Sequence, residues 1–274
     1  MAVKTNEGLH HAVPNVAIVF ASFGMFFGLW WLLSRFASIP AYLLPPPEQV
    51  FTTLIDLLTG RAPGSNIWVD IAASLQRQLL GFGGAVLIGA PLGIACGYLG
   101  GWMTGVDRAL RVIYPIPTFA WIPLVLIWFG PGGQAITFMV CMSAFWPIYM
   151  QAYAGTRQLS SRYLWVANAL GATPVAIAKS ILLPGILPFL LNGLRLGYGE
   201  AWRLLVAAEI LLATTGLGHM IQVSRSMLEV SKIMAGMAVI GLLGLFVERF
   251  VFDRIEAATI RKWHRSAPSQ SDHA

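Results

Sequence analysis

The sequence predicts an all-α membrane protein with about six transmembrane helices and both termini in the cytoplasm. Of its 274 residues, 57% are hydrophobic and only 11% are charged, and the mean hydropathy is +0.68. A soluble domain carries roughly 25% charged residues, so this chain has too little polar surface to cover a water-facing globule. Several apolar stretches are also long enough to cross ~30 Å of hydrocarbon as helices. These two observations, with the distribution of basic residues, predict the fold class.

Six stretches are expected to span the bilayer: residues 16–33, 79–99, 113–129, 135–154, 186–212 and 233–251. Together they make residues 16–252 a transmembrane domain, preceded by a cytoplasmic leader of residues 1–15 and followed by a basic cytoplasmic tail of residues 253–274. The first stretch resembles a signal peptide in length. The segment from Ser34 to Tyr42 has no small-x-small cleavage site, which favours a retained anchor. Residues 39–70 are expected to lie outside the membrane.

The basic residues orient the spans. With six spans, both ends of the chain lie on one side, and that side holds twelve of the 18 Lys and Arg residues. The opposite side and the spans hold the other six. An excess of basic residues marks the cytoplasmic face of a membrane protein. The segment between the fourth and fifth spans, about residues 155–185, is therefore expected in the cytoplasm too.

Small residues and prolines shape the expected helices. Gly81, Ala85, Gly89, Gly93 and Gly97 recur every four residues, so they share one helix face and let a neighbouring backbone approach closely. Ordinary packing within the subunit and a sliding interface both fit this stripe. Prolines are expected to kink three of the spans: Pro91, Pro123 and Pro147.

Several function classes lack support in the sequence. The net charge of +6 comes from residues that flank apolar spans, which indicates orientation signals rather than nucleic-acid binding. Cys96 and Cys141 lie in apolar runs without metal-ligand spacing. No HExxH or GxSxG motif and no phosphate-binding loop occur. We therefore expect a non-catalytic chain that binds no cofactor or metal and cannot hydrolyse ATP itself.

The cytoplasmic segment has an unusual pattern of polar residues between apolar ones. A short helix up to Leu170, a break at Gly171 and a second helix opening at Thr173-Pro174 are expected, because threonine caps helices and proline suits a first helical position. A second break is expected at residues 183–185. The resulting partly apolar hook would project into the cytoplasm, and an exposed apolar surface of this kind favours docking to a partner.

This segment resembles a motif of the permeases of bacterial ATP-binding cassette importers. The motif reads Glu-Ala-Ala, three residues, Gly, nine residues, Ile-x-Leu-Pro. Ala167, Gly171 and the run 181–184 match it at the correct spacing, whereas Trp165 and Val166 replace its glutamate and first alanine. Across residues 40–255, further segments resemble the nitrate/taurine/sulfonate/bicarbonate branch: residues 43–47, 73–77, 120–124, 127–130, 183–188, 192–195, 206–209 and 216–218.

The resemblance implies a type I importer permease in the inner (plasma) membrane of a bacterium. Such permeases work by alternating access as a pair, here two copies of this chain. They act with two ATPase subunits that hold ATP and Mg²⁺ and with an extracytoplasmic solute-binding protein. The ATPase-coupling residues would be Trp165, Val166, Ala167, Gly171, Ala172, Thr173, Ile181, Leu183 and Pro184. Trp165 either supplies an apolar anchor in place of the glutamate or occupies a position that varies freely.

The substrate expected from the branch is a small organic or inorganic anion. Taurine or another sulfonate comes first, ahead of nitrate, bicarbonate, aromatic acids and a thiamine-precursor pyrimidine. Selectivity in such importers resides mostly in the separate binding protein.

Charged residues inside the fifth span are the other functional candidates. Ionised groups at membrane depth face a cavity or one another. Glu200 and Arg203 are three residues apart and can pair on one helix face. They either fix the helix register, or Arg203 presents positive charge to an anionic substrate. With Glu209 and Trp121 they form the predicted translocation pathway, while Arg77 is interpreted as an interfacial anchor that reaches water.

Three other functions compete with the importer. A secondary transporter or channel for small anions would show a carboxylate relay or an inverted repeat, and neither is clear in the two halves. A membrane-embedded enzyme would need clustered catalytic residues, whereas the five histidines are scattered. A scaffolding membrane protein is disfavoured only by the family resemblance. Copurification with an ATPase subunit separates the importer from the first two.

Overall fold

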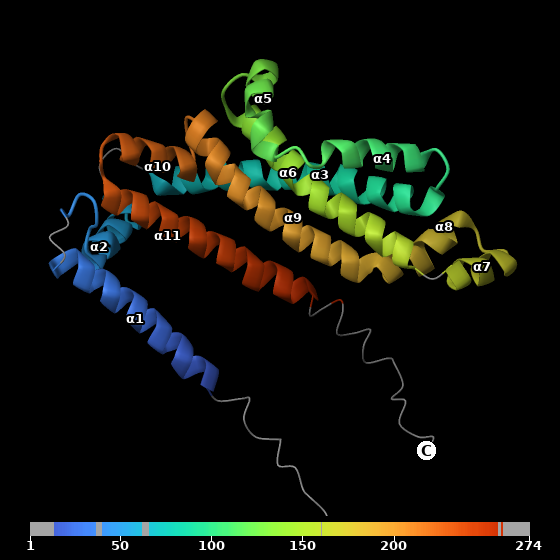
Figure 1. Cartoon of the computed structure of the whole chain (residues 1–274), viewed down its shortest axis with the longest axis horizontal. Coiled ribbons are helices and arrows are strands. Elements are labelled where there is room, and N and C mark those ends of the chain that lie inside the picture. Colours follow the sequence, from blue (N-terminus) through green and yellow to red (C-terminus); the bar gives the residue numbers. More distant parts are fainter. Residues whose placement is uncertain (1–13, 37–39, 62–65, 160, 257–258, 260–274) are drawn as a thin grey trace, which may run out of the picture.

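The computed structural model describes residues 14–36, 40–61, 66–159, 161–256 and 259, and within them all regular structure is helical (Figure 1). The elements in order are α1 Pro14–Phe36, α2 Pro47–Leu58, α3 Ile67–Leu99, α4 Met103–Ile113, η1 Thr118–Trp121, α5 Ile122–Phe129, α6 Gly133–Gln158, α7 Ser161–Ala169, α8 Pro174–Ile177, η2 Ala178–Leu182, α9 Leu183–Leu212, α10 Leu217–Ser226, α11 Val230–Val247 and η3 Glu248–Phe252. The predicted all-α class is confirmed. The leader before Pro14 and most of the tail lie outside the described residues.

The centre of the molecule is a layer in which α6 packs between α3 and α9. The small-residue stripe of α3 meets α6 within the same chain. A Cβ added to Gly93 would lie 2.5 Å from the carbonyl oxygen of Tyr149, and one added to Gly97 would lie 2.7 Å from Cβ of Thr156. On the other side of α6, a Cβ on Gly193 of α9 would lie 2.8 Å from Cβ of Gln151. Glycine thus permits both close helix contacts.

Against the expectation of about six spans, four helices among the described residues are long and apolar enough to cross a membrane: residues 67–99, 133–158, 174–212 and 230–256. A fifth candidate is a bent pair, α4 with η1–α5. α1 lies where the first span was predicted, and α2 lies in the region predicted outside the membrane. α3 begins at Ile67, earlier than the predicted span, and the polar residues in its first turns, Asp70 and Arg77, have partners inside the protein.

The third predicted span, residues 113–129, is not one helix. Its two parts, residues 103–113 and 118–129, meet at an angle of 88°. Pro115 and Pro117 lie at the bend, where each removes a helical hydrogen bond. α4 is held against α6 by the buried carboxylate of Asp107, which accepts hydrogen bonds from the Tyr149 hydroxyl at 2.8 Å and from Nε of Arg111 at 2.9 Å. By contrast, α3 and α6 continue through Pro91 and Pro147.

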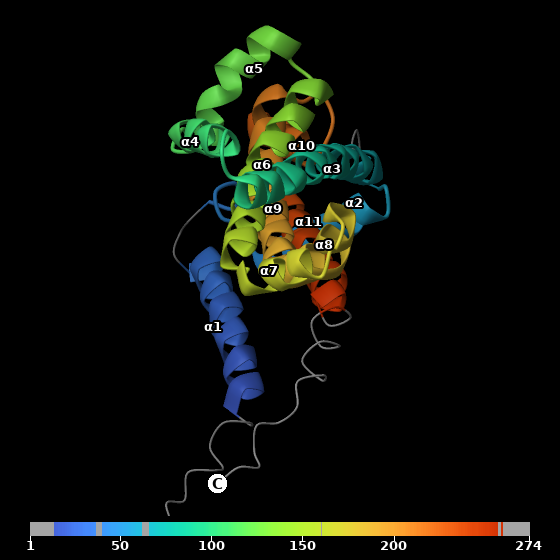
Figure 2. The same cartoon turned by 90° about the vertical axis from the view of Figure 1, so that its right-hand side faces the viewer.

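The two ends of the bundle carry different elements. α7 and α8 lie at one end of the long helices, and α2, α5 and α10 lie towards the other (Figure 1). The start of α1 and the end of α11 point towards the end that carries α7 and α8, as the perpendicular view also shows (Figure 2). The start of α1 and the end of α11 thus lie on the side of the segment of residues 155–185, as the charge count predicts for the chain that enters α1 and leaves α11.

Candidate functional site

The end of α7 is a glycine-terminated turn. Gly171 has a φ of +74°, in the left-handed region that favours glycine. Its N–H donates to the carbonyl of Asn168 and the N–H of Ala172 donates to the carbonyl of Ala167, both at 3.0 Å. This is the hydrogen-bond pattern of a Schellman motif with glycine just past the helix end. The predicted break at Gly171 is confirmed, and its cause is local backbone geometry.

The next helix, α8, opens as expected. Thr173 is its cap, because its Oγ1 accepts a hydrogen bond from the N–H of Ala176 at 3.3 Å. Pro174 occupies the first helical position, where its missing N–H leaves no helical bond unmade.

The predicted second break at residues 183–185 is wrong. The chain continues from α8 through the π-turn η2 into α9, and the whole stretch of residues 174–212 is one helix. The N–H of Leu183 bonds to the carbonyl of Ala178, five residues back. Such π-type turns occur mostly as single widened turns inside α-helices. Here the widened turn precedes Pro184, whose ring disfavours a regular turn, so the proline is accommodated without a break.

The α7–α8 segment presents an apolar surface that its own chain does not cover. We call this surface the apolar knob, and it consists of exposed Tyr163, Trp165, Val166, Leu170 and Val175. Trp165 is 77% exposed and Leu170 is 81% exposed. Of the other predicted coupling residues, Ala167 is buried, Ala172, Ile181 and Pro184 are half-buried, and Gly171, Thr173 and Leu183 are exposed. The knob matches the predicted apolar hook.

Glu209 is the centre of a buried polar network. Its side chain is fully buried and accepts hydrogen bonds from Ser74 Oγ at 2.8 and 2.9 Å and from the N–H of Gly218 at 3.0 Å. Nη1 of Arg77 lies 2.6 Å from its Oε1. The carboxylate rests against Gly216, where an added Cβ would lie 2.5 Å from Oε1. These contacts join α3, the end of α9 and the start of α10.

The interpretation of Arg77 as an anchor that reaches water is wrong. Its side chain is only 13% exposed, and besides Glu209 it binds Thr215 through the carbonyl oxygen at 2.7 Å and Oγ1 at 2.9 Å. Sequence reasoning missed this pair because the two residues are 132 positions apart. The available signal was one basic and one acidic residue inside apolar stretches, since charges at membrane depth seek partners.

The other charged residues of α9 form the predicted pair. Nη2 of Arg203 donates to Oε1 of Glu200 at 2.7 Å. In contrast to Glu209, both are exposed on the single chain, with side-chain exposures of 54% for Glu200 and 70% for Arg203. Trp121 lies in η1, half-buried against the main core. The structure thus brings Glu200 and Arg203 together, whereas Glu209 pairs with Arg77.

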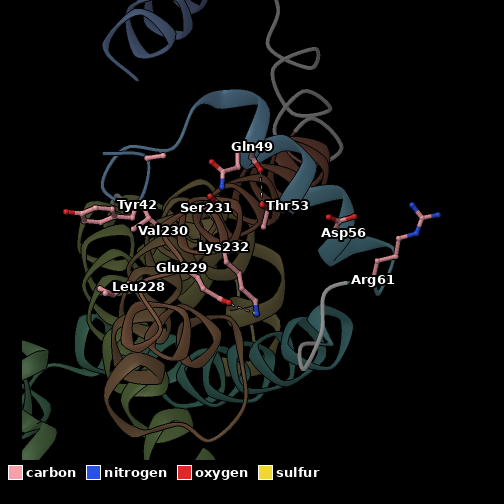
Figure 3. Close-up of a pocket in the computed structure, with 11 residues that line it drawn as sticks. Tyr42, Gln49, Thr53, Asp56, Arg61, Leu228, Glu229, Val230, Ser231 and Lys232 are labelled. Carbon is pink, nitrogen blue, oxygen red and sulfur yellow. Dashed lines mark hydrogen bonds and ion pairs between the residues drawn. The ribbon is translucent and has the colours of Figure 1, made fainter. Parts of the chain in front are cut away.

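A polar cleft of about 450 Å³ lies between α2 and the start of α11 (Figure 3). α2 lies towards the end of the bundle opposite α7 and α8 (Figure 1). One wall is α2 with Gln49, Thr53 and Asp56, and the other is residues 228–232, at the end of the turn after α10 and the start of α11. Leu228 in this turn has a φ of +58°, which is rare for a residue other than glycine. Within the described residues, no three His, Cys, Asp or Glu side chains group as metal ligands.

Comparison with known proteins decides between the function classes. Residues 89–265 match the model of the family described as "binding-protein-dependent transport system inner membrane component". The chain belongs to this family. It is 34% identical to the taurine transport system permease protein TauC of Escherichia coli, over 90% of this chain and 94% of TauC. It is 28% identical to the putative aliphatic sulfonates transport permease protein SsuC of Bacillus subtilis, over 87% of this chain and 84% of SsuC.

The fold of this permease also has a solved counterpart. A chain of the MetNI methionine ABC transporter, in an inward-facing conformation, superposes with a TM-score of 0.61, covering 70% of the permease and 97% of that chain at 19% identity. The type I importer permease fold is therefore confirmed. The protein is a multi-pass, inner-membrane permease subunit of an ATP-binding cassette importer, and members of this family are transport subunits rather than enzymes.

Proposed function

We propose that two copies of this permease form the pathway of an importer that moves a small sulfonate, such as taurine, into the cytoplasm. Two ATPase subunits hold ATP and Mg²⁺, and one of them docks on the α7–α8 segment of each permease copy. A solute-binding protein docks at the opposite end. The observation that carries this proposal is the apolar knob at one end of a fold that belongs to the importer family.

The ATPase contact is assigned to the knob for a physical reason. Trp165, Leu170 and Val175 are exposed beyond the long helices, where no hydrocarbon would cover them if this end faces the cytoplasm. Large apolar side chains in contact with water favour a protein partner. Trp165 supplies an aromatic anchor of the kind enriched at interface centres, in place of the glutamate of the family motif. We assign the rest of the contact to Ala172 and Thr173, before α8, and to Ile181 and Leu183, after it.

The opposite end suits a polar partner. The cleft between α2 and the α10–α11 turn carries acidic and basic side chains, including Asp56, Arg61 and Lys232. We assign the binding-protein contact to this end of the bundle, because delivery of solute from outside and coupling to ATP inside need opposite faces.

The substrate assignment rests on the relatives. TauC, which is named for taurine transport, matches the permease over nearly its whole length, and SsuC is named for aliphatic sulfonates. Within the pathway, Glu200 and Arg203 contact the substrate and Trp121 lies beside its route. Glu209 acts as a positioning residue that holds α3, α9 and α10 together at the edge of the pathway, since its carboxylate is already bound by Ser74 and Arg77.

Reconstitution tests the proposal. The permease, its ATPase and its binding protein are placed in proteoliposomes, and uptake of radiolabelled taurine is followed with and without ATP. The expected result is taurine uptake that requires both ATP and the binding protein. Uptake that proceeds without ATP would support a secondary transporter or channel, and absence of sulfonate uptake in a complex with active ATPase would reject the substrate class.

A further inference from the structure

The Glu200–Arg203 pair lies deep in a membrane helix and faces away from the packed core. Glu200 is twelve residues from the end of α9 at Leu212, which is roughly 18 Å along the helix axis. The exposed residues Asn192, Leu196, Glu200 and Arg203 follow one another at spacings of four, four and three, so they form one stripe on α9. The buried residues Tyr198, Ala201, Trp202 and Leu205 lie on the other side of the helix.

Such a stripe does not suit hydrocarbon. Charged side chains at this depth are costly to place against lipid, and they face a water-filled cavity or the interior of an assembly. Two charges with side-chain exposures of 54% and 70% therefore need an aqueous or protein surrounding that the single chain does not provide. This requirement fits the central pathway between two copies of the permease.

The pair as a whole is neutral, which limits what it attracts. An anion that approaches Arg203 also approaches the Glu200 carboxylate, whose Oε1 is 2.7 Å from Nη2 of Arg203. The two opposite charges largely cancel for a simple anion such as nitrate. A molecule that carries both a cationic and an anionic group gains from both charges at once.

The free hydrogen-bonding groups match the same kind of molecule. Among the described residues, the single contact between the two side chains leaves Oε2 of Glu200 and both Nε and Nη1 of Arg203 without a hydrogen-bond partner. A guanidinium offers five N–H donors in a planar fork, which suits a sulfonate, and a carboxylate oxygen accepts from an ammonium.

We infer that Glu200 and Arg203 form a zwitterion-selective site in the translocation pathway, in which Arg203 binds the sulfonate and Glu200 the ammonium group of a small aminosulfonate. This inference rests on the proposed function and deepens it. Glu200 acts in two ways, because it attracts the ammonium group and repels molecules that carry only a negative charge. Discrimination by an added repulsive element is a general route to specificity.

The test compares taurine with isethionate, which has the same two-carbon sulfonate but a hydroxyl in place of the ammonium group. Equilibrium binding of each radiolabelled compound is measured to the permease–ATPase complex in nanodiscs without binding protein, so that the binding protein's own selectivity does not enter. The variants are Glu200→Gln and Arg203→Gln. The matched control is Glu48→Gln, because Glu48 is also an exposed carboxylate paired with an arginine, at 3.6 Å from Arg35 and with 51% exposure, but lies on α2.

The wild-type complex and Glu48→Gln should prefer taurine by about tenfold or more, the scale of one charge-assisted hydrogen bond. Glu200→Gln should lose most of that preference and bind isethionate better than the wild type does. Arg203→Gln should weaken both compounds. An unchanged preference in Glu200→Gln, or no taurine binding by the wild type, would overturn the inference. In that case, taurine uptake by the wild type in proteoliposomes would still support the proposed function. Absence of taurine uptake would reject both the proposed function and the zwitterion-selective site.

Discussion

Single residues set the geometry of both candidate sites, and two of them do so in different ways. Gly171 acts through its backbone, because its φ of +74° ends α7 while its side-chain position is open, with nothing within 4 Å of an added Cβ. Glu209 acts through its side chain, which is fully buried and joins three helices by hydrogen bonds. Substitutions at these positions therefore have different expected outcomes.

Gly171→Val should uncouple transport from ATP hydrolysis while the permease still assembles in the membrane. Valine is strained at a positive φ, so the turn that presents Leu170 would rearrange. Asparagine tolerates this region, and Gly171→Asn should keep most of the uptake. Uptake and ATP hydrolysis in proteoliposomes check both variants. Equal uptake by Gly171→Val and the wild type would show that the turn has no role in coupling.

Glu209→Ala should destabilise the permease by about 3–5 kcal/mol, the usual cost of removing one partner of a buried ion pair. Arg77 would be left without its carboxylate in a position that is only 13% exposed. The double variant Arg77→Ala/Glu209→Ala should lose less than the sum of the single variants, because the two residues are in direct contact. Unfolding of the detergent-solubilised protein measures these differences. Full additivity would mean that the pair contributes no coupling energy.

Helices and their junctions show what the sequence can predict. The break at Gly171 and the cap at Thr173 follow from residues whose preferences are local, so their positions were predicted correctly. The continuous helix through Pro184 was not predicted, because η2 depends on a hydrogen bond between Leu183 and Ala178 that no residue type signals. Two prolines, Pro115 and Pro117, indicated an interruption of the third span but not its 88° bend.

The close contact between α3 and α6 gives a prediction with an internal control. Gly93→Ala should lower thermal stability and yield, because the new Cβ would lie 2.5 Å from the Tyr149 carbonyl oxygen and 2.8 Å from Cβ of Ala152. Gly83→Ala in the same helix has nothing within 4 Å of its added Cβ. It should be neutral or slightly stabilising, since alanine is the better helix former. Thermal unfolding of both variants checks the interface, and equal stability of the two would contradict it.

At the scale of the whole molecule, the permease is a bundle with α7 and α8 at one end and α2 towards the other (Figure 1). The apolar knob lies on α7 and α8, and the polar cleft lies beside α2. Composition and basic-residue counts predicted the membrane class and the shared side of the start of α1 and the end of α11, because both depend on sums over many residues. The pairing of Arg77 with Glu209 depends on how distant helices pack, and a single sequence gave no direct signal for it. The candidate pathway pair, Glu200 and Arg203, was predictable because the two residues lie within one helical turn.

The apolar knob is expected to couple the permease to its ATPase. The most direct measurement is ATP-driven uptake, together with copurification of the ATPase subunit, for the double variant Trp165→Glu/Leu170→Glu. Leu43→Glu is the control, because Leu43 is also exposed, at 60%, but lies in the turn before α2. The double variant should lose the ATPase subunit or hydrolyse ATP without uptake, while the control keeps the bound subunit and the uptake. Wild-type uptake with a bound ATPase in the double variant would contradict this role of the knob.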